Sequence, residues 1–128
     1  MLEGLFAKGC VYAGRFTGID HEKYFIIVGV SKDKTSFCSA FINSNIPRYV
    51  LSNSTLLCLQ VNIQSRKYDF LTHDSFVSCT SINKHAMPDL LKCRYIGKID
   101  DSDLENILTT IINSDVLTDK EKDLYFFD

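Results

Sequence analysis

The run from Lys23 to Val30 constrains the fold of this chain more than any other part of its sequence. It reads Lys-Tyr-Phe-Ile-Ile-Val-Gly-Val, so aromatic and β-branched residues follow one another almost without interruption. Such residues favour a strand, and apolar side chains on both sides of a strand require cover on both faces of the sheet. The run is far shorter than the roughly 20 apolar residues that cross a membrane. We therefore expect a central strand in a folded domain.

Further strand patterns lie on both sides of this run. They consist of short apolar or alternating stretches that are bounded by turn-forming residues. The patterns predict strands over residues 9–16, 35–42, 56–63, 66–71 and 75–82, turns at 17–20 and 31–34, and a polar loop at 48–54. The chain thus holds about six strands at hairpin-like spacing before the first good helix pattern.

Residues 102–113 carry the strongest helix pattern. Ser102 is followed three residues later by Glu105, which is the arrangement of a capping box. Apolar residues then recur at helical spacing, namely Leu104, Ile107, Leu108, Ile111 and Ile112. We expect a helix here, packed against one end of the sheet.

Thr118 and Glu121 repeat the capping-box pattern and predict a short final helix over about residues 119–125. The chain then closes on four apolar residues, Leu124, Tyr125, Phe126 and Phe127. We expect these residues to dock onto the sheet, and a contact with a second copy or a partner is the alternative.

The composition agrees with one domain over residues 1–128. The chain is 45% hydrophobic and 12% aromatic, and its 2 prolines and 6 glycines exclude a low-complexity chain. Strands first and helices last predict a mainly β fold with a C-terminal helix, in the α+β class. We expect a small curved antiparallel sheet or barrel over about residues 8–99 and helices over about 102–125.

The cysteines and histidines do not have metal-site spacing. Five cysteines are widely spaced and mostly flanked by apolar residues, so we interpret them as small core side chains: Cys10, Cys38, Cys58, Cys79 and Cys93. The three histidines lie at positions 21, 73 and 85, far from one another in sequence. We expect no metal and no cofactor. The N-terminus has no pattern of a secretory signal, which favours the cytoplasm.

The net charge of −2 hides two regions of opposite sign. Residues 1–98 hold twelve Lys and Arg against seven Asp and Glu, a charge of +5, whereas residues 99–128 hold two Lys against nine acids, a charge of −7. A basic body suits an anionic partner such as nucleic acid. Acidic helix starts and solvated faces also produce such blocks, and this second interpretation is the more common one.

Five short segments match, in their order and spacing, the pattern of a known family. They are residues 8–12, with Gly before a strand, the apolar run 23–29, the strand end 39–44, the segment His-Asp-Ser-Phe-Val at 73–77, and Tyr-Ile-Gly-Lys-Ile at 95–99 before the predicted helix. Together they resemble the PemK/MazF-like family. This resemblance implies a small SH3-like antiparallel β-barrel, and it extends over most of the chain, from about residue 8 to 113.

The best known members of that family are mRNA interferases of toxin–antitoxin pairs. The resemblance therefore implies a cytoplasmic endoribonuclease toxin that cleaves single-stranded RNA without a metal. It also implies a homodimer, an antitoxin protein as partner and no membrane association.

The resemblance places the candidate catalytic residues at the ends of two neighbouring strands. The family's catalytic arginine falls on Lys23 and its catalytic threonine on Asn43, which leaves Ser44 as the nearest hydroxyl. Lysine keeps the attraction to phosphate but loses the two-pronged geometry of arginine. We interpret Lys23 as a phosphate stabiliser with Asn43 and Ser44 beside it. Asn43 and Ser44 are also ordinary strand-ending residues.

Other charged residues are weaker candidates. His21 lies two residues before Lys23 and is a candidate acid or base, although a hydrated turn histidine is the more common case. Arg15 and Arg48 are candidate contacts to an RNA backbone, or simply solvated arginines. His73, next to Asp74, is an oriented imidazole or the end of a turn, and the turn is favoured.

The two substitutions at the expected catalytic positions also support an interpretation from a different class. In this alternative the barrel has lost its nuclease activity and binds another protein, as the related gyrase-poisoning toxins do, or acts as a regulatory module. The apolar C-terminal end after the acidic helix would then be the contact surface.

Overall fold

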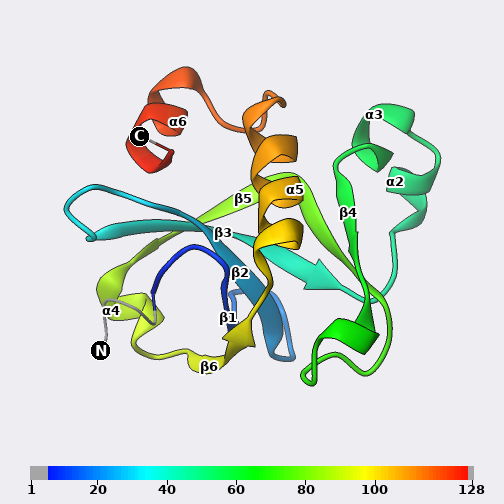
Figure 1. Cartoon of the computed structure of the whole chain (residues 1–128), viewed down its shortest axis with the longest axis horizontal. Coiled ribbons are helices and arrows are strands. Elements are labelled where there is room, and N and C mark those ends of the chain that lie inside the picture. Colours follow the sequence, from blue (N-terminus) through cyan, green and yellow to red (C-terminus); the bar gives the residue numbers. More distant parts are fainter. Residues whose placement is uncertain (1–5, 127–128) are drawn as a thin grey trace.

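The structure, a computed structural model, describes residues 6–126. Its strands are β1 (Cys10–Gly14), β2 (Lys23–Val30), β3 (Ser36–Asn43), β4 (Gln60–Ile63), β5 (Ser75–Ala86) and β6 (Arg94–Lys98). Its helices are α2 (Arg48–Leu51), α3 (Ser54–Leu57), α4 (Met87–Leu90), α5 (Asp101–Ile112) and α6 (Asp119–Tyr125), with a 3₁₀ turn η1 (Ser65–Lys67). Figure 1 shows α5 crossing one face of the sheet, with α6 beyond its end.

The six strands form one antiparallel sheet in the order β4-β5-β3-β2-β1-β6. The predicted central strand is confirmed, because β2 has the expected bounds and lies between β1 and β3. The mainly β class is confirmed too. The strand pairing does not close a barrel, since the edge strands β4 and β6 do not pair with each other.

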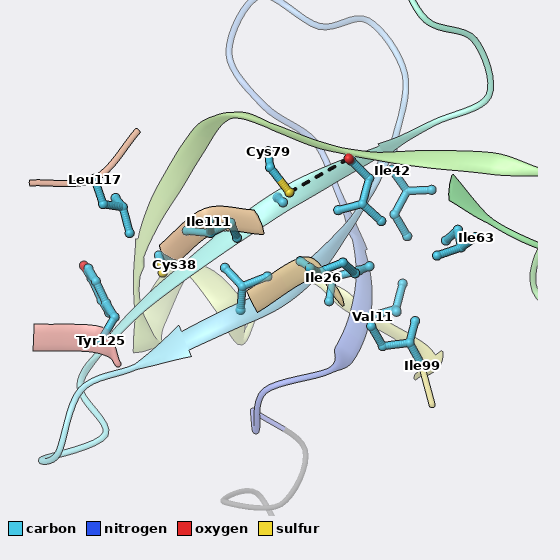
Figure 2. Packing of buried hydrophobic residues seen from close by; sticks show 14 of the residues in the cluster. Val11, Ile26, Cys38, Ile42, Ile63, Cys79, Ile99, Ile111, Leu117 and Tyr125 are labelled. Carbon is cyan, nitrogen blue, oxygen red and sulfur yellow. Dashed lines mark hydrogen bonds between the residues drawn. The ribbon is translucent and has the colours of Figure 1, made fainter. Parts of the chain in front are cut away.

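The alternation of side chains along β2 divides the core into two clusters. Ile26 and Val28 belong to the cluster that α5 covers with Ile107 and Ile111. Figure 2 shows Ile111 above Cys38 and near Ile26 within this cluster. Every one of these side chains is fully buried, which explains why the central run is apolar on this side.

The opposite face of β2 carries an aromatic cluster. Phe25 and Ile27 point into it, together with Tyr12 and Phe37. Phe16, in the β1–β2 connection, folds over this face, and its ring meets the ring of Phe25 edge-on at 5.5 Å. The connection between β1 and β2 is therefore fixed to the sheet by an aromatic contact.

Two predicted strands are wrong in part or in full. Residues 56–59 belong to α3 and the turn after it, and only the second half of the 56–63 pattern is a strand. Asn53 caps α3, because its side-chain oxygen accepts hydrogen bonds from the backbone N–H groups of Thr55 and Leu56. The predicted polar loop likewise contains α2.

The second error concerns residues 66–71, which are not a strand: residues 66–67 belong to the 3₁₀ turn η1 and residues 68–71 follow it. Tyr68 and Phe70 point to the core side instead, and the Phe70 ring lies 3.0 Å from where a Cβ of Gly97 would be. Residues 68–70 thus pack against β6, which is an edge strand of the sheet. The sixth strand of the sheet is β6 itself, which was not predicted as a strand.

The start of α5 differs from the predicted capping box. The N-cap is Asp100, whose carboxylate accepts a hydrogen bond from the N–H of Asp103 at 2.8 Å. Lys67 bridges Asp100 and Asp103 at 2.6 and 3.0 Å. The Tyr68 hydroxyl donates to Asp103 at 2.5 Å. This network stabilises Asp100 as the N-cap, so α5 begins before the predicted cap Ser102. The same contacts join α5 to the segment after β4.

The final helix α6 begins with the predicted Thr118–Glu121 capping box. Tyr125 is buried at 3% exposure and packs on β2, whereas Leu124 remains 45% exposed. The predicted docking is thus confirmed for Tyr125, and Phe127 lies outside the described residues. The apolar end is accordingly not an open contact surface at Tyr125.

The cysteine prediction is confirmed for Cys10, Cys38 and Cys79, which are buried thiols. Cys58 is exposed and Cys93 is half-buried, so for Cys58 the interpretation as a core side chain is wrong. Within residues 6–126, no helix is long and apolar enough to cross a membrane.

Gly29 has no side chain, and Tyr125 packs directly against its backbone. This contact between β2 and α6 can be tested by mutation. A Cβ at Gly29 would lie 2.6 Å from the Cβ of Tyr125 and 2.6 Å from the Sγ of Cys38. We predict that Gly29→Ala lowers the free energy of unfolding by about 1–3 kcal/mol and speeds amide hydrogen exchange in α6. Glu105→Ala is the control, because Glu105 is exposed on α5. Unchanged exchange in α6 of the Gly29 variant would contradict this packing.

Candidate functional site

The start of β2 and the end of β3 meet at one edge of the sheet. The two strands are antiparallel, and Tyr24 pairs with Ile42. This register places Lys23 next to Asn43, and the Lys23 ammonium donates a hydrogen bond to the Asn43 side-chain oxygen. The two residues that the family resemblance singled out, 20 positions apart, therefore face each other.

A hollow of about 420 Å³ opens at this edge. Three segments line it: the β1–β2 connection with the start of β2, the end of β3, and the connection before β5. Its polar lining consists of His21, Glu22, Lys23, Tyr24, Asn43, Ser44, Asn45, Thr72, His73 and Ser75. Ile42, Phe70 and Leu71 supply the apolar part.

Lys23 is half-buried at the wall of this hollow. Its ammonium lies 5.2 Å from the centre of the Phe41 ring, and burial lowers the pKa of Lys23. Glu22, the nearest carboxylate in sequence, instead accepts a hydrogen bond from Arg94 at 2.8 Å. Within the described part of the chain, no carboxylate pairs with Lys23. Its charge is therefore available to an anion.

Aromatic packing holds this lysine in place. Phe41 lies two residues before Asn43 on β3, and the ring of Phe16 meets it edge-on at 4.9 Å. The same Phe16 anchors the β1–β2 connection, which contributes His21 to the hollow. One aromatic cluster thus positions both the ammonium and the neighbouring loop.

The connection before β5 is folded back by Asp74. Its carboxylate accepts hydrogen bonds from the N–H of Ser65 at 2.8 Å and from the Ser65 hydroxyl at 3.1 Å. These bonds lower the pKa of Asp74. His73, next to it, is exposed and lines the hollow.

The hollow brings four of the candidate residues together, Lys23, His21, Asn43 and Ser44. Arg15 does not line it. Arg15 lines a different hollow and donates a hydrogen bond to the backbone oxygen of Asp20 at 3.2 Å. Arg48 begins α2 and lines neither hollow. The two arginines are therefore not part of the arrangement around Lys23.

The sequence reasoning missed the contribution of residues 70–75. Phe70 and Leu71 belong to the segment that was predicted as a strand, and His73 was interpreted as the end of a turn. The available signal was the turn-forming Thr-His-Asp sequence between two apolar runs. That signal predicts a loop, but it does not say which strand ends the loop faces.

The arrangement suits the recognition of a phosphate group. An ammonium offers a positive charge, and Asn43, Ser44 and Asn45 offer neutral donors around it. In residues 6–126, no group of three or more His, Cys, Asp and Glu side chains is placed to hold a metal ion.

The fold was compared with known proteins. No protein-family model matches the chain, and no curated protein matches it in sequence. Among solved structures, the Mycobacterium tuberculosis toxin MazF-mt6 matches with a TM-score of 0.55 and 15% identity. The match covers 85% of this chain and 98% of that one. The chain has a MazF/PemK-like fold. At this identity the likeness is one of fold, so the roles of the residues rest on the geometry of the hollow.

The environment of Lys23 within this MazF/PemK-like fold predicts its titration. We expect Lys23 to titrate below the ordinary lysine pKa of about 10.4, because partial burial disfavours the charged form. Asn43→Ala removes an acceptor from the ammonium and should lower the pKa of Lys23 further. Carbon-13 NMR of the Lys23 Cε resonance measures both values. A pKa of Lys23 at or above 10.4 in the wild-type protein would contradict the description.

Proposed function

We propose that this protein is an endoribonuclease of the toxin–antitoxin type that cleaves single-stranded RNA without a metal. The observation that carries the proposal is the half-buried Lys23 ammonium, which Asn43 and Phe41 hold at the wall of an open hollow without a carboxylate partner. The MazF/PemK-like fold agrees with it.

The proposed reaction is attack of a ribose 2′-oxygen on the adjacent phosphorus. The 2′-O–P bond forms, the P–O5′ bond breaks, and negative charge accumulates on the phosphoryl oxygens between these events. Lys23 stabilises that charge as a point cation, while Asn43 and Ser44 donate hydrogen bonds to the phosphoryl oxygens. A base takes the 2′-OH proton and an acid protonates the leaving 5′-oxygen.

Single-stranded RNA is the substrate class that suits the hollow. A flexible strand brings its phosphate and ribose to a recessed cation, whereas a duplex presents its backbone along a regular helix. Tyr24 and Phe70 border the hollow and supply aromatic surface beside the lysine. The excess of positive charge over residues 1–98 attracts the backbone over a longer range.

The same proposal includes the biological setting. The protein acts in the cytoplasm as a homodimer, and an antitoxin protein holds it inactive. The charge of −7 over residues 99–128 suits a basic segment of such a partner.

A second candidate function is binding of another protein without RNA cleavage. Lys23 and Asn43 stand where the resembled family has its catalytic arginine and threonine, and these two differences favour the second candidate. The exposed apolar residues of α2 and α3 favour it too. Tyr49 is 67% exposed, and Leu51 and Leu57 are also exposed. Tyr is enriched at protein interfaces, and exposed apolar side chains add contact area to them.

The two candidates differ in the effect of Lys23→Ala. For the nuclease we predict that purified protein cuts labelled single-stranded RNA in the presence of a chelator, and that Lys23→Ala slows the cutting by about 100-fold or more. Lys120→Ala is the matched control, because Lys120 is exposed on α6, away from the hollow. Gel analysis of the RNA measures the rates.

Intact RNA with the wild-type protein would refute the nuclease. Cutting that Lys23→Ala leaves unchanged would refute the site. Protein binding without cutting, lost on Tyr49→Ala and Leu51→Ala, would establish the second candidate instead.

A further inference from the structure

Two histidines face the hollow from different segments of the chain. His21 belongs to the β1–β2 connection and His73 to the connection before β5, and both line the same space of about 420 Å³ as Lys23. Both side chains are exposed. The fold therefore presents two imidazoles, 52 positions apart in sequence, to any phosphate held at Lys23.

Each imidazole is held through the same ring nitrogen. The Nδ1 of His21 lies 3.0 Å from an oxygen of the Asp20 carboxylate, and the Nδ1 of His73 lies 3.1 Å from the Thr72 hydroxyl. Within the described residues, neither Nε2 has a hydrogen-bond partner. Both Nε2 atoms are thus available to a substrate.

The hydrogen-bond partners of the two histidines, the Asp20 carboxylate and the Thr72 hydroxyl, differ in what they can donate and accept. A carboxylate only accepts, so the Nδ1 of His21 carries the proton and the Nε2 of neutral His21 presents its lone pair. A hydroxyl both donates and accepts, so Thr72 allows His73 to carry a proton on Nε2. The first arrangement suits a general base and the second a general acid.

We propose that His73 is a catalytic residue, and that it acts with His21 as an acid–base pair on either side of the phosphate bound at Lys23. His21 takes the proton of the 2′-OH as the 2′-O–P bond forms. His73 gives a proton to the 5′-oxygen as the P–O5′ bond breaks. The products are a 2′,3′-cyclic phosphate and a free 5′-hydroxyl, and the protons balance without a metal. This inference rests on the proposed nuclease function.

The surrounding charges are compatible with this division. On the His21 side lie Asp20 and Glu22, and Arg94 neutralises Glu22. On the His73 side lies Asp74, which is engaged by Ser65. Between the two sides, Lys23 and Tyr24 complete the titratable lining. Lys23 is the competing candidate for the acid, so the experiment must separate it from His73.

The test measures the pH dependence of single-turnover RNA cleavage between about pH 5 and 9. A base that must be unprotonated makes the rate rise with pH, and an acid that must be protonated makes it fall at higher pH. We expect a bell-shaped profile for the wild-type protein. His21→Gln should lose the rise, His73→Gln should lose the fall, and each should slow cleavage by about 100-fold or more at the optimum.

A substrate with sulfur in place of the bridging 5′-oxygen isolates the acid. A thiolate leaves without protonation, so His73→Gln should cleave this RNA within about 10-fold of the wild-type rate, while His21→Gln remains slow. Lys120→Gln is the control, because Lys120 is exposed on α6 and lies outside the hollow. This control should keep both limbs of the profile.

The outcomes separate this inference from the function on which it rests. Normal cleavage by His73→Gln, or an alkaline fall that persists in it, overturns the role of His73 and leaves the nuclease standing. A wild-type protein that cleaves no RNA overturns both. Thermal melting of each variant checks the fold, and because both histidines are exposed we expect melting temperatures close to the wild-type value.

Discussion

The antiparallel register between β2 and β3 determines the arrangement of the site. Pairing of Tyr24 with Ile42 brings the first residue of β2 beside the last residue of β3, which joins Lys23 to Asn43. A shift of one residue between the two strands would place Lys23 and Asn43 on opposite faces of the sheet. The apolar run of β2 prevents that shift, because it would also exchange the residues of the two core clusters. The stability of the core and the geometry of the hollow thus depend on the same pairing.

Aromatic packing extends this constraint to the loops. Phe16 packs against Phe25 and Phe41, and these contacts hold the β1–β2 connection against the sheet. Phe41 in turn lies beneath the Lys23 ammonium. The third wall of the hollow is set by a different device, the hydrogen bonds of Asp74 to Ser65. Side chains from three segments therefore line one hollow, although the segments are held in place by different contacts. Sites built from loops on a rigid sheet are often of this kind.

The sequence was sufficient for the parts of the fold that have strong local patterns. The run at 23–30 and the Thr118–Glu121 cap have local physical causes, and the structure contains both. Residues 56–59 and 66–71 were predicted incorrectly as strands. Asn53 caps a short helix before β4, and the Tyr68 hydroxyl forms a hydrogen bond with Asp103 of α5, which lies 35 positions further along the chain. The family resemblance placed Lys23 beside Asn43, and His21 lies two residues before Lys23, but neither argument brought His73 to the site. Nothing in the sequence around residue 73 indicates which strand ends it faces.

The central claim is that the hollow at Lys23 binds the phosphate and ribose of a single RNA strand. The most direct measurement is an NMR titration with a short single-stranded RNA in which 2′-O-methyl groups prevent cleavage. The account predicts saturable shifts at the Lys23 side chain, the Asn43 amide and the imidazoles of His21 and His73. Shifts that are absent, or that are confined to residues outside the hollow such as Tyr49 and Leu51, would contradict it.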